Sequence, residues 1–117
     1  MRRVSLLRLL LAVGAALTLL GCEVNQSTLP AGQRLQITPA AMEYYQQYLR
    51  DMGNGGGAFA VSLSGQQAAY DYCPAQRCIG GSGGYAGKAL TMCQKGGDKC
   101  VLFARDGRIL VPYDVVP

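Results

Sequence analysis

The first 21 residues constrain the fold most strongly, because their pattern is that of a segment that is removed before the protein folds. Arg8 precedes an apolar run at residues 9–20 that only Gly14 and Thr18 interrupt. A charged end followed by a short apolar stretch is typical of a secretory signal peptide. Twelve residues at about 1.5 Å each are too short to cross a hydrocarbon core of about 30 Å. The sequence therefore predicts a cleaved signal peptide at residues 1–21.

The apolar run ends directly at Leu19-Leu20-Gly21-Cys22. A small residue before a cysteine at this place is the lipobox pattern, so the chain resembles the precursor of a bacterial lipoprotein. The alternative is an ordinary cysteine near an ordinary cleavage site, but no A-x-A-like site competes convincingly. The resemblance implies that Cys22 becomes the N-terminus and carries a diacylglycerol and an N-acyl chain such as palmitate. Each buried methylene contributes about 0.8 kcal/mol, so several chains would anchor the protein stably in a membrane.

Residues 22–37 are predicted to be the lipidated N-terminus and a flexible tether, and residues 38–117 a small domain. The tether is polar and shows little apolar periodicity. As a coil of about 15 residues it would span roughly 20 Å. Glu23 follows the lipidated cysteine, where Asp favours inner-membrane retention in enteric-type bacteria. The absence of Asp at position 23 therefore favours anchoring in the outer membrane, with the domain facing the periplasm.

Removal of the leader changes the charge of the protein. The whole chain has 11 basic and 7 acidic residues, but three of the basic ones precede position 22. The remaining 96 residues are nearly neutral and large enough for one modest domain. Such a balance gives no electrostatic case for binding nucleic acid.

Four more cysteines, Cys73, Cys78, Cys93 and Cys100, form an even set in a chain that is expected to leave the reducing cytosol. This predicts two disulfides. Zinc is the alternative. However, the spacings C-x4-C and C-x6-C lack the short C-x2-C motif, and the sequence contains no histidine, so we expect no metal site.

Residues 38–52 are predicted to form an amphipathic helix. Thr38 can cap its N-terminus, Pro39 suits its first turn, and the glycine-rich residues 53–57 end it. The apolar side recurs at helical spacing and comprises Ala41, Tyr45, Tyr48, Leu49 and Met52. We interpret the tyrosines as core residues whose hydroxyls lie at the rim.

A period of two replaces the helical period after the glycines, which predicts strands. The expected strands lie at residues 59–63, 68–73, 101–103 and 109–111. Ser64-Gly65-Gln66 and Asp106-Gly107 would supply the two hairpin turns.

A second helix is predicted from Ala86, Ala89, Leu90 and Cys93 at i, i+3, i+4 and i+7. Ser82 would cap this helix and Gly96-Gly97 would end it. The fold class is thus α+β, a small antiparallel sheet of about four strands in two hairpins packed against two helices. This order favours the pairs Cys93–Cys100 and Cys73–Cys78, although spacing alone leaves three connectivities open.

Three short motifs fall within residues 57–111: G-A-F-A-V-S at 57–62, A-x-x-A-L-x-x-C at 86–93, and C-V-L-F-A at 100–104. On these motifs the chain resembles a loosely defined group of small secreted bacterial domains of unknown function. The resemblance implies that the helix cysteine, Cys93, pairs with the strand cysteine, Cys100. Cys73 and Cys78 depart from the simplest pattern of that group. The resemblance implies no activity.

Catalytic constellations are scarce. The absence of histidine excludes Ser-His and Cys-His nucleophile pairs. A glycosidase-like carboxylate pair would have to come from Glu43, Asp51, Asp71, Asp98, Asp106 and Asp114. We expect these residues at turns and on solvated faces instead, and therefore no enzymatic activity.

The glycine-rich residues 80–88 fail the phosphate-loop pattern, since Ser82 and Ala89 stand where glycine and a hydroxyl residue are required. We expect no nucleotide. We interpret residues 77–88 as a flexible loop that presents Arg77, Tyr85 and Lys88, which could bind a partner.

Together these features predict a non-enzymatic, lipid-anchored envelope protein, a binding or structural module that contacts another envelope protein. Its only attached groups would be the lipids on Cys22. The alternative is an inhibitor or accessory factor of a cell-wall enzyme, for which the sequence holds no motif.

Overall fold

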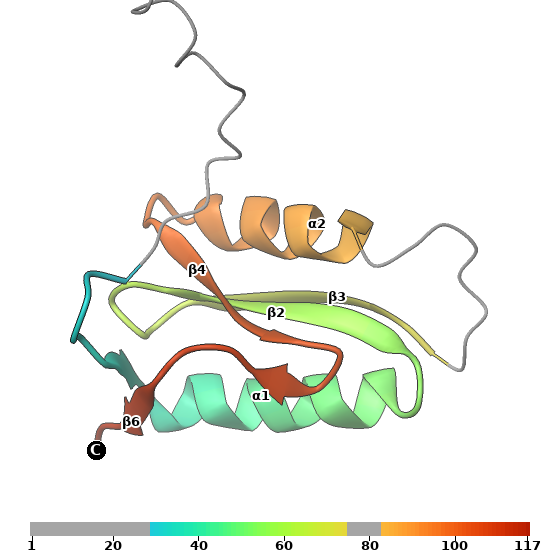
Figure 1. The fold of residues 1–117 in the computed structure, drawn as a ribbon, viewed down its shortest axis with the longest axis horizontal. Helices are drawn as coiled ribbons and strands as arrows, with labels where there is room; N and C mark the ends of the chain where they lie inside the picture. The colour runs from blue at the N-terminus through green and yellow to red at the C-terminus, as the bar shows by residue number, and fades with distance from the viewer. Residues whose placement is uncertain (1–28, 75–82) are drawn as a thin grey trace, which may run out of the picture.

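The computed structural model describes residues 29–74 and 83–117. The predicted signal peptide, Cys22, Arg77, Cys78 and Ser82 lie outside these residues. The elements, in chain order, are β1 (Leu35–Ile37), α1 (Pro39–Met52), β2 (Gly56–Ser62), β3 (Ala68–Cys73), α2 (Gly83–Gln94), β4 (Cys100–Arg105), β5 (Arg108–Ile109) and β6 (Tyr113–Val115) (Figure 1). The α+β class, the two helices and the two antiparallel hairpins are confirmed.

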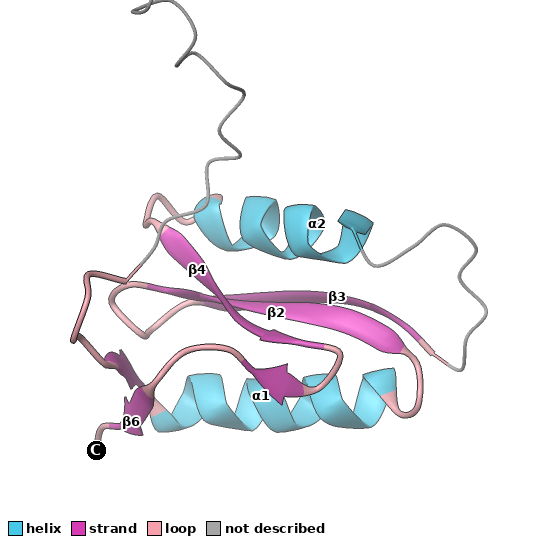
Figure 2. Cartoon of the chain, viewed as in Figure 1, coloured by secondary structure: helices cyan, strands magenta, loops and turns pink. Residues whose placement is uncertain are grey.

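The main sheet has four antiparallel strands in the order β3-β2-β4-β5. Helix α1 covers one face of the sheet and α2 covers the other, so the fold has three layers (Figure 2). The central strand β2 is therefore buried on both faces. Phe59 and Val61 face α1, whereas Ala58 and Ala60 face α2. The two faces of β2 therefore carry side chains of different size, large ones toward α1 and alanines toward α2.

Helix α1 begins as predicted. The Thr38 side chain accepts a hydrogen bond from Ala41 N at 3.2 Å, and Pro39 occupies the first turn, where it loses no hydrogen bond. The helix ends at Met52, before Gly53, whose φ of +55° favours glycine. Tyr45 and Tyr48 are buried on the sheet side, which confirms the predicted apolar face.

An aromatic core joins α1 to the sheet. The Tyr45 ring lies 5.3 Å from the rings of both Phe59 and Phe103, with edge-on geometry in each case. Phe103 is the extra residue of a β-bulge, because Phe59 pairs with Ala104 and the next residue of β2 pairs with Leu102. The bulge leaves Phe103 and Ala104 on the same face, toward α1.

The second core lies between the sheet and α2 and is built mainly of small side chains. Ala89 and Leu90 of α2 pack there on Ala58 and Ala60 of β2. Alanines on both α2 and β2 allow the helix to pack closely on the strand. The side chains of this core are therefore smaller than those of the aromatic core.

A two-stranded parallel pair, β1 with β6, was missed by the sequence analysis. Its strands have three residues each, too few for a period to show. Leu35 and Ile37 are fully buried against α1. The tether was predicted to extend to residue 37. This limit is wrong, because β1 belongs to the folded part.

The limits of three strands also differ from the predicted ones. Strand β2 begins at Gly56 rather than at position 59, and β4 spans Cys100–Arg105 rather than residues 101–103. Strand β2 ends at Ser62, and Leu63, which follows it, is exposed. Strand β5 ends at Ile109 rather than at position 111. At these two ends an apolar residue after the last ladder pair extended the apparent alternation.

Candidate functional site

The disulfide Cys93–Cys100 is present, as predicted. It joins the end of α2 to the start of β4 with a Cα–Cα distance of 6.2 Å, and both residues are buried. It is the one disulfide whose two cysteines both belong to the described residues. Cys73 is also disulfide-bonded. Its predicted partner, Cys78, lies outside the described residues, so the pair Cys73–Cys78 stays a prediction.

The predicted partner-binding residues are only partly described. Arg77 lies outside the described residues. The loop predicted to present Tyr85 and Lys88 is wrong at these positions, because both residues lie on α2, one turn apart. Their two side chains differ in surroundings. Tyr85 packs, half-buried, against the α2-side core beside Gly56, whereas Lys88 is exposed. Tyr85 therefore contributes to packing, and Lys88 is the one exposed member of the described pair.

Four of the six carboxylates bind other protein groups. Asp106 Oδ1 accepts from Gly57 N at 3.0 Å, and Asp98 accepts from Ser64 Oγ at 3.0 Å. Asp114 forms a salt bridge of 3.0 Å with Arg34, which lowers the pKa of that carboxyl. Asp51 accepts the Tyr70 hydroxyl. Each of these four carboxylates therefore has a structural role in the fold.

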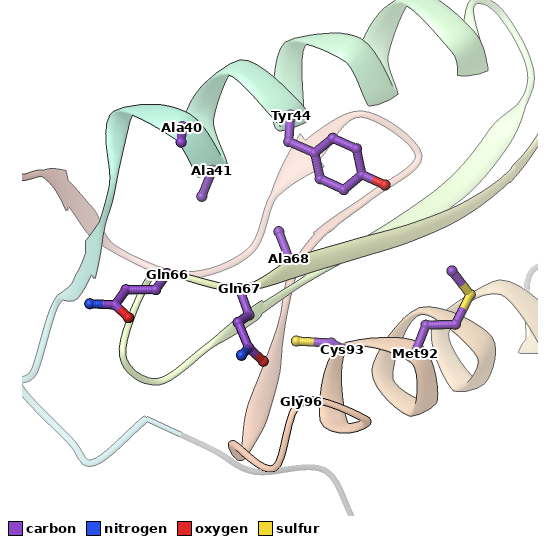
Figure 3. A pocket seen from close by; sticks show the side chains of 9 residues that line it. All are labelled: Ala40, Ala41, Tyr44, Gln66, Gln67, Ala68, Met92, Cys93 and Gly96. Atoms are coloured by element: carbon purple, nitrogen blue, oxygen red, sulfur yellow. The ribbon is translucent and has the colours of Figure 1, made fainter.

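The clearest recessed surface lies at the β3 edge of the sheet, between the two helices. We call it the edge groove. It has a volume of about 470 Å³ and is lined by Ala40, Ala41, Tyr44, Gln66, Gln67, Ala68, Met92, Cys93 and Gly96 (Figure 3). The walls come from the start of α1 and the end of α2, and the β2–β3 turn lies between them. Tyr44 is 42% exposed and Met92 is 45% exposed, so two large side chains are open to a partner.

The main chain of β3 is open along this edge. Strand β3 is the terminal strand of the sheet and pairs only with β2 within the described residues. Ser62 N donates to Gln67 O at 2.9 Å. Because main-chain groups alternate between the two sides of an antiparallel strand, those of Ala68, Tyr70 and Tyr72 point away from β2. These groups are the ones an added strand would bind.

Tyrosines line the α1 side of the same edge. The Tyr70 ring lies 4.8 Å from the ring of Tyr44 and 5.8 Å from that of Tyr72. Burial, with the hydrogen bond to Asp51, raises the pKa of Tyr70. Its phenol is therefore protonated at neutral pH and donates to that carboxylate. The bond fixes Tyr70 and leaves Tyr44 and the 39%-exposed Tyr72 as the accessible rings.

Gln67 is held by the opposite wall of the groove. A Cβ at position 96 would overlap the side-chain amide of Gln67, so the absence of a side chain at Gly96 makes room for it. From the sequence, Gly96 was expected to end a helix and Gln66 to belong to a hairpin turn, and no pattern marked Gln67. Alternation does group Tyr70 with Tyr72, but which strand lies at the edge depends on the pairing of distant strands.

Within residues 29–74 and 83–117, no cluster of acidic or cysteine side chains could hold a metal ion. The two helices of this part, with 14 and 12 residues, are too short to cross a bilayer.

In comparisons with known proteins, no protein-family model, no curated protein and no solved structure matches the chain. The resemblances to lipoprotein precursors and to small secreted bacterial domains therefore stay predictions. Function has to be inferred from the residues and their geometry.

Proposed function

We propose that this chain is a membrane-anchored, non-enzymatic binding module of the bacterial cell envelope, and that it binds an extended segment of another envelope protein at the edge of β3. The anchor is the lipid expected on Cys22, and the expected place is the outer membrane, facing the periplasm. The pattern Leu19-Leu20-Gly21-Cys22 supports the anchor.

One observation carries the binding role: the open edge of β3 is flanked by exposed side chains. Three alternate residues offer main-chain donors and acceptors there. Tyr44, Tyr72 and Met92 are exposed beside them. Addition of a strand gives affinity through the main chain, while neighbouring side chains give specificity. Aromatic residues and methionine are enriched in such interfaces.

The edge carries few of the features that keep strand edges unpaired. It contains no proline and no lysine, and Asp71 is its one charged residue. Natural sheets usually block such edges with charges, proline or bulges. A six-residue regular edge strand with exposed tyrosine therefore favours a bound segment. The structural use of four carboxylates supports a role without catalysis.

Photocrosslinking in living cells tests this role. A photoreactive residue placed at Tyr44 or Tyr72 should capture one defined envelope protein, identified by mass spectrometry. The same residue at Arg108, on the other edge of the sheet, should not capture it.

A matched pair of substitutions tests the strand-addition mode. Tyr72→Pro removes an outward N–H that takes no part in the pairing with β2, whereas Tyr72→Val loses the ring but keeps the N–H. We expect the proline variant to lose the capture at Tyr44 and the valine variant to keep most of it. Equal capture from both edges, or capture of a second copy of this chain alone, would contradict the proposed partner.

A further inference from the structure

A second surface, far from β3 in the sheet order, combines exposed apolar and basic residues. We call it the hairpin surface; it comprises Arg105, Arg108, Ile109 and Leu110. Leu110 is 53% exposed, more than any other large apolar side chain of the described residues, and Ile109 is 39% exposed. Ile109 and Leu110 are adjacent in sequence, at the end of β5. Contiguous exposed apolar side chains are typical of surfaces that contact a protein or a membrane.

The two arginines lie directly opposite each other across the β4–β5 hairpin. Both are exposed, and neither forms an ion pair within residues 29–74 and 83–117, where the salt bridge is Arg34–Asp114. Like charges placed opposite each other destabilise a hairpin. The nearest acidic residue in sequence, Asp106, already accepts a hydrogen bond from Gly57 N. The pair is therefore well placed to bind an external anion.

Leu110 also borders a mostly apolar groove of about 390 Å³, which we call the N-terminal groove. It is lined by Leu29, Pro30, Ala31, Gly32, Gln33, Val101, Leu102, Leu110, Val111 and Pro112. One wall is thus the first described segment of the chain. The other wall includes Leu110 of the hairpin surface. The N-terminal groove and the hairpin surface therefore form one apolar face, with the two arginines beside it.

Chain length places this face close to the expected anchor. Leu29 is the seventh residue after Cys22. Seven residues reach at most about 25 Å when fully extended. If Cys22 is lipidated, Leu29, which lines the N-terminal groove, cannot lie farther than that from the membrane surface.

We propose that the hairpin surface and the N-terminal groove rest on the lipid bilayer, with the arginines on anionic headgroups and Ile109 and Leu110 at the boundary with the acyl chains. This inference rests on the proposed lipid anchor. Arginine binds phosphate with two parallel hydrogen bonds. Each basic residue near an anionic surface shifts the contact equilibrium by a factor of about five. The contact would hold the domain so that β3, at the other edge of the sheet, stays accessible to a partner.

The chain has no tryptophan, so a single introduced indole reports on lipid contact. Leu110→Trp places it on the hairpin surface, and Tyr72→Trp, the matched control, places it on the β3 edge. Both positions are exposed, so both variants should fold. The lipidated protein is reconstituted in vesicles of phosphatidylcholine and phosphatidylglycerol, with brominated phosphatidylcholine as the quencher. We expect about threefold stronger quenching at position 110, because interfacial apolar groups lie about 5–10 Å deep.

The arginines are tested in the Leu110→Trp background. Arg105→Gln with Arg108→Gln should lower the contact equilibrium about thirtyfold in anionic vesicles, and have little effect in pure phosphatidylcholine. Arg50→Gln with Lys95→Gln removes the same charge elsewhere and should leave the quenching unchanged. A chain that does not float with vesicles contradicts the anchor and this inference together. A chain that floats but is quenched equally at positions 110 and 72 contradicts this inference alone.

Discussion

The hydroxyl of Tyr48 lies 3.2 Å from the backbone nitrogen of Gly107 and accepts its hydrogen bond. The bond joins α1 to the turn of the β4–β5 hairpin, 59 residues later in the chain. Asp106 and Gly107 have positive φ angles of 50° and 79°, which confirms the tight turn predicted from the Asp-Gly pair. Tyr45 donates to the carbonyl of Gly107 at 3.4 Å. Two buried tyrosines thus hold one turn, and their hydroxyls have a structural role.

Tyr48→Phe tests this role. The substitution leaves Gly107 N–H without its acceptor, so we expect a loss of about 1–2 kcal/mol in the free energy of unfolding. Urea denaturation measures the change. Tyr44→Phe removes a hydroxyl from an exposed ring and should cost less than about 0.5 kcal/mol. Equal losses in the two variants would mean that the turn does not depend on Tyr48.

Gly65 and Gly32 form a matched pair for a test of the contact between the β2–β3 turn and β1. Both have positive φ, 76° and 82°. A Cβ at position 32 meets nothing within 4 Å, whereas one at position 65 would overlap the carbonyl of Gln36. Gly32→Ala should cost about 1 kcal/mol from backbone strain alone. Gly65→Ala should cost about 3 kcal/mol or more, since β1 must also move. Similar costs would show that β1 does not pack there.

The disulfide Cys93–Cys100 closes a short loop, with a sequence separation of 7. Replacement of both cysteines by alanine should lower the free energy of unfolding by about 2.5 kcal/mol, as expected from loop-closure entropy. The same urea experiment measures the loss. Peptide mapping of the unreduced protein should recover the two cysteines in one linked peptide pair. Alkylation of Cys93 without prior reduction would contradict the structure.

Alkaline pH should weaken the fold. The pKa of Tyr70 is raised above its ordinary value of 10.0, first by burial and then by the hydrogen bond to Asp51. The unfolded chain therefore releases this proton at lower pH than the folded chain does. The stabilising contribution is complete below about pH 10 and is lost as the pH rises toward the folded-state pKa.

Unfolding in urea between about pH 9 and pH 11 measures this dependence. Tyr70→Phe should show a shallower decline in the free energy of unfolding than the unmodified protein. Some decline should stay, because burial also raises the pKa of Tyr45 and Tyr48. An unchanged slope in Tyr70→Phe would show that this phenol does not titrate differently in the two states.

Local patterns predicted most elements of the fold. Thr38-Pro39 and Gly53 gave the limits of α1, because capping depends on adjacent residues. Asp106-Gly107 gave the second hairpin for the same reason. The face of each helix followed from its period. In contrast, β1 and β6 come from distant parts of the chain and have three residues each, so their burial depends on tertiary packing and not on a local period.

The candidate site was harder to predict than the fold. Tyr44 lies on α1, Gln67 in the β2–β3 turn and Met92 on α2, and the three line one groove because β3 is an edge strand between two helices. No spacing in the sequence links them. The hairpin surface is a similar case. Asp106-Gly107 predicted the turn, but the pairing of Arg105 with Arg108 and the exposure of Leu110 beside them could be seen only in the structure.

The intact mass of the native protein, extracted with detergent from the membranes of the cells that make it, tests the central claim most directly. We expect a chain that begins at Cys22, is free of residues 1–21, and is heavier than its polypeptide by a diacylglycerol and an N-linked acyl group. An unmodified polypeptide mass, or a first residue other than Cys22, would contradict the lipid anchor and the membrane contact that depends on it.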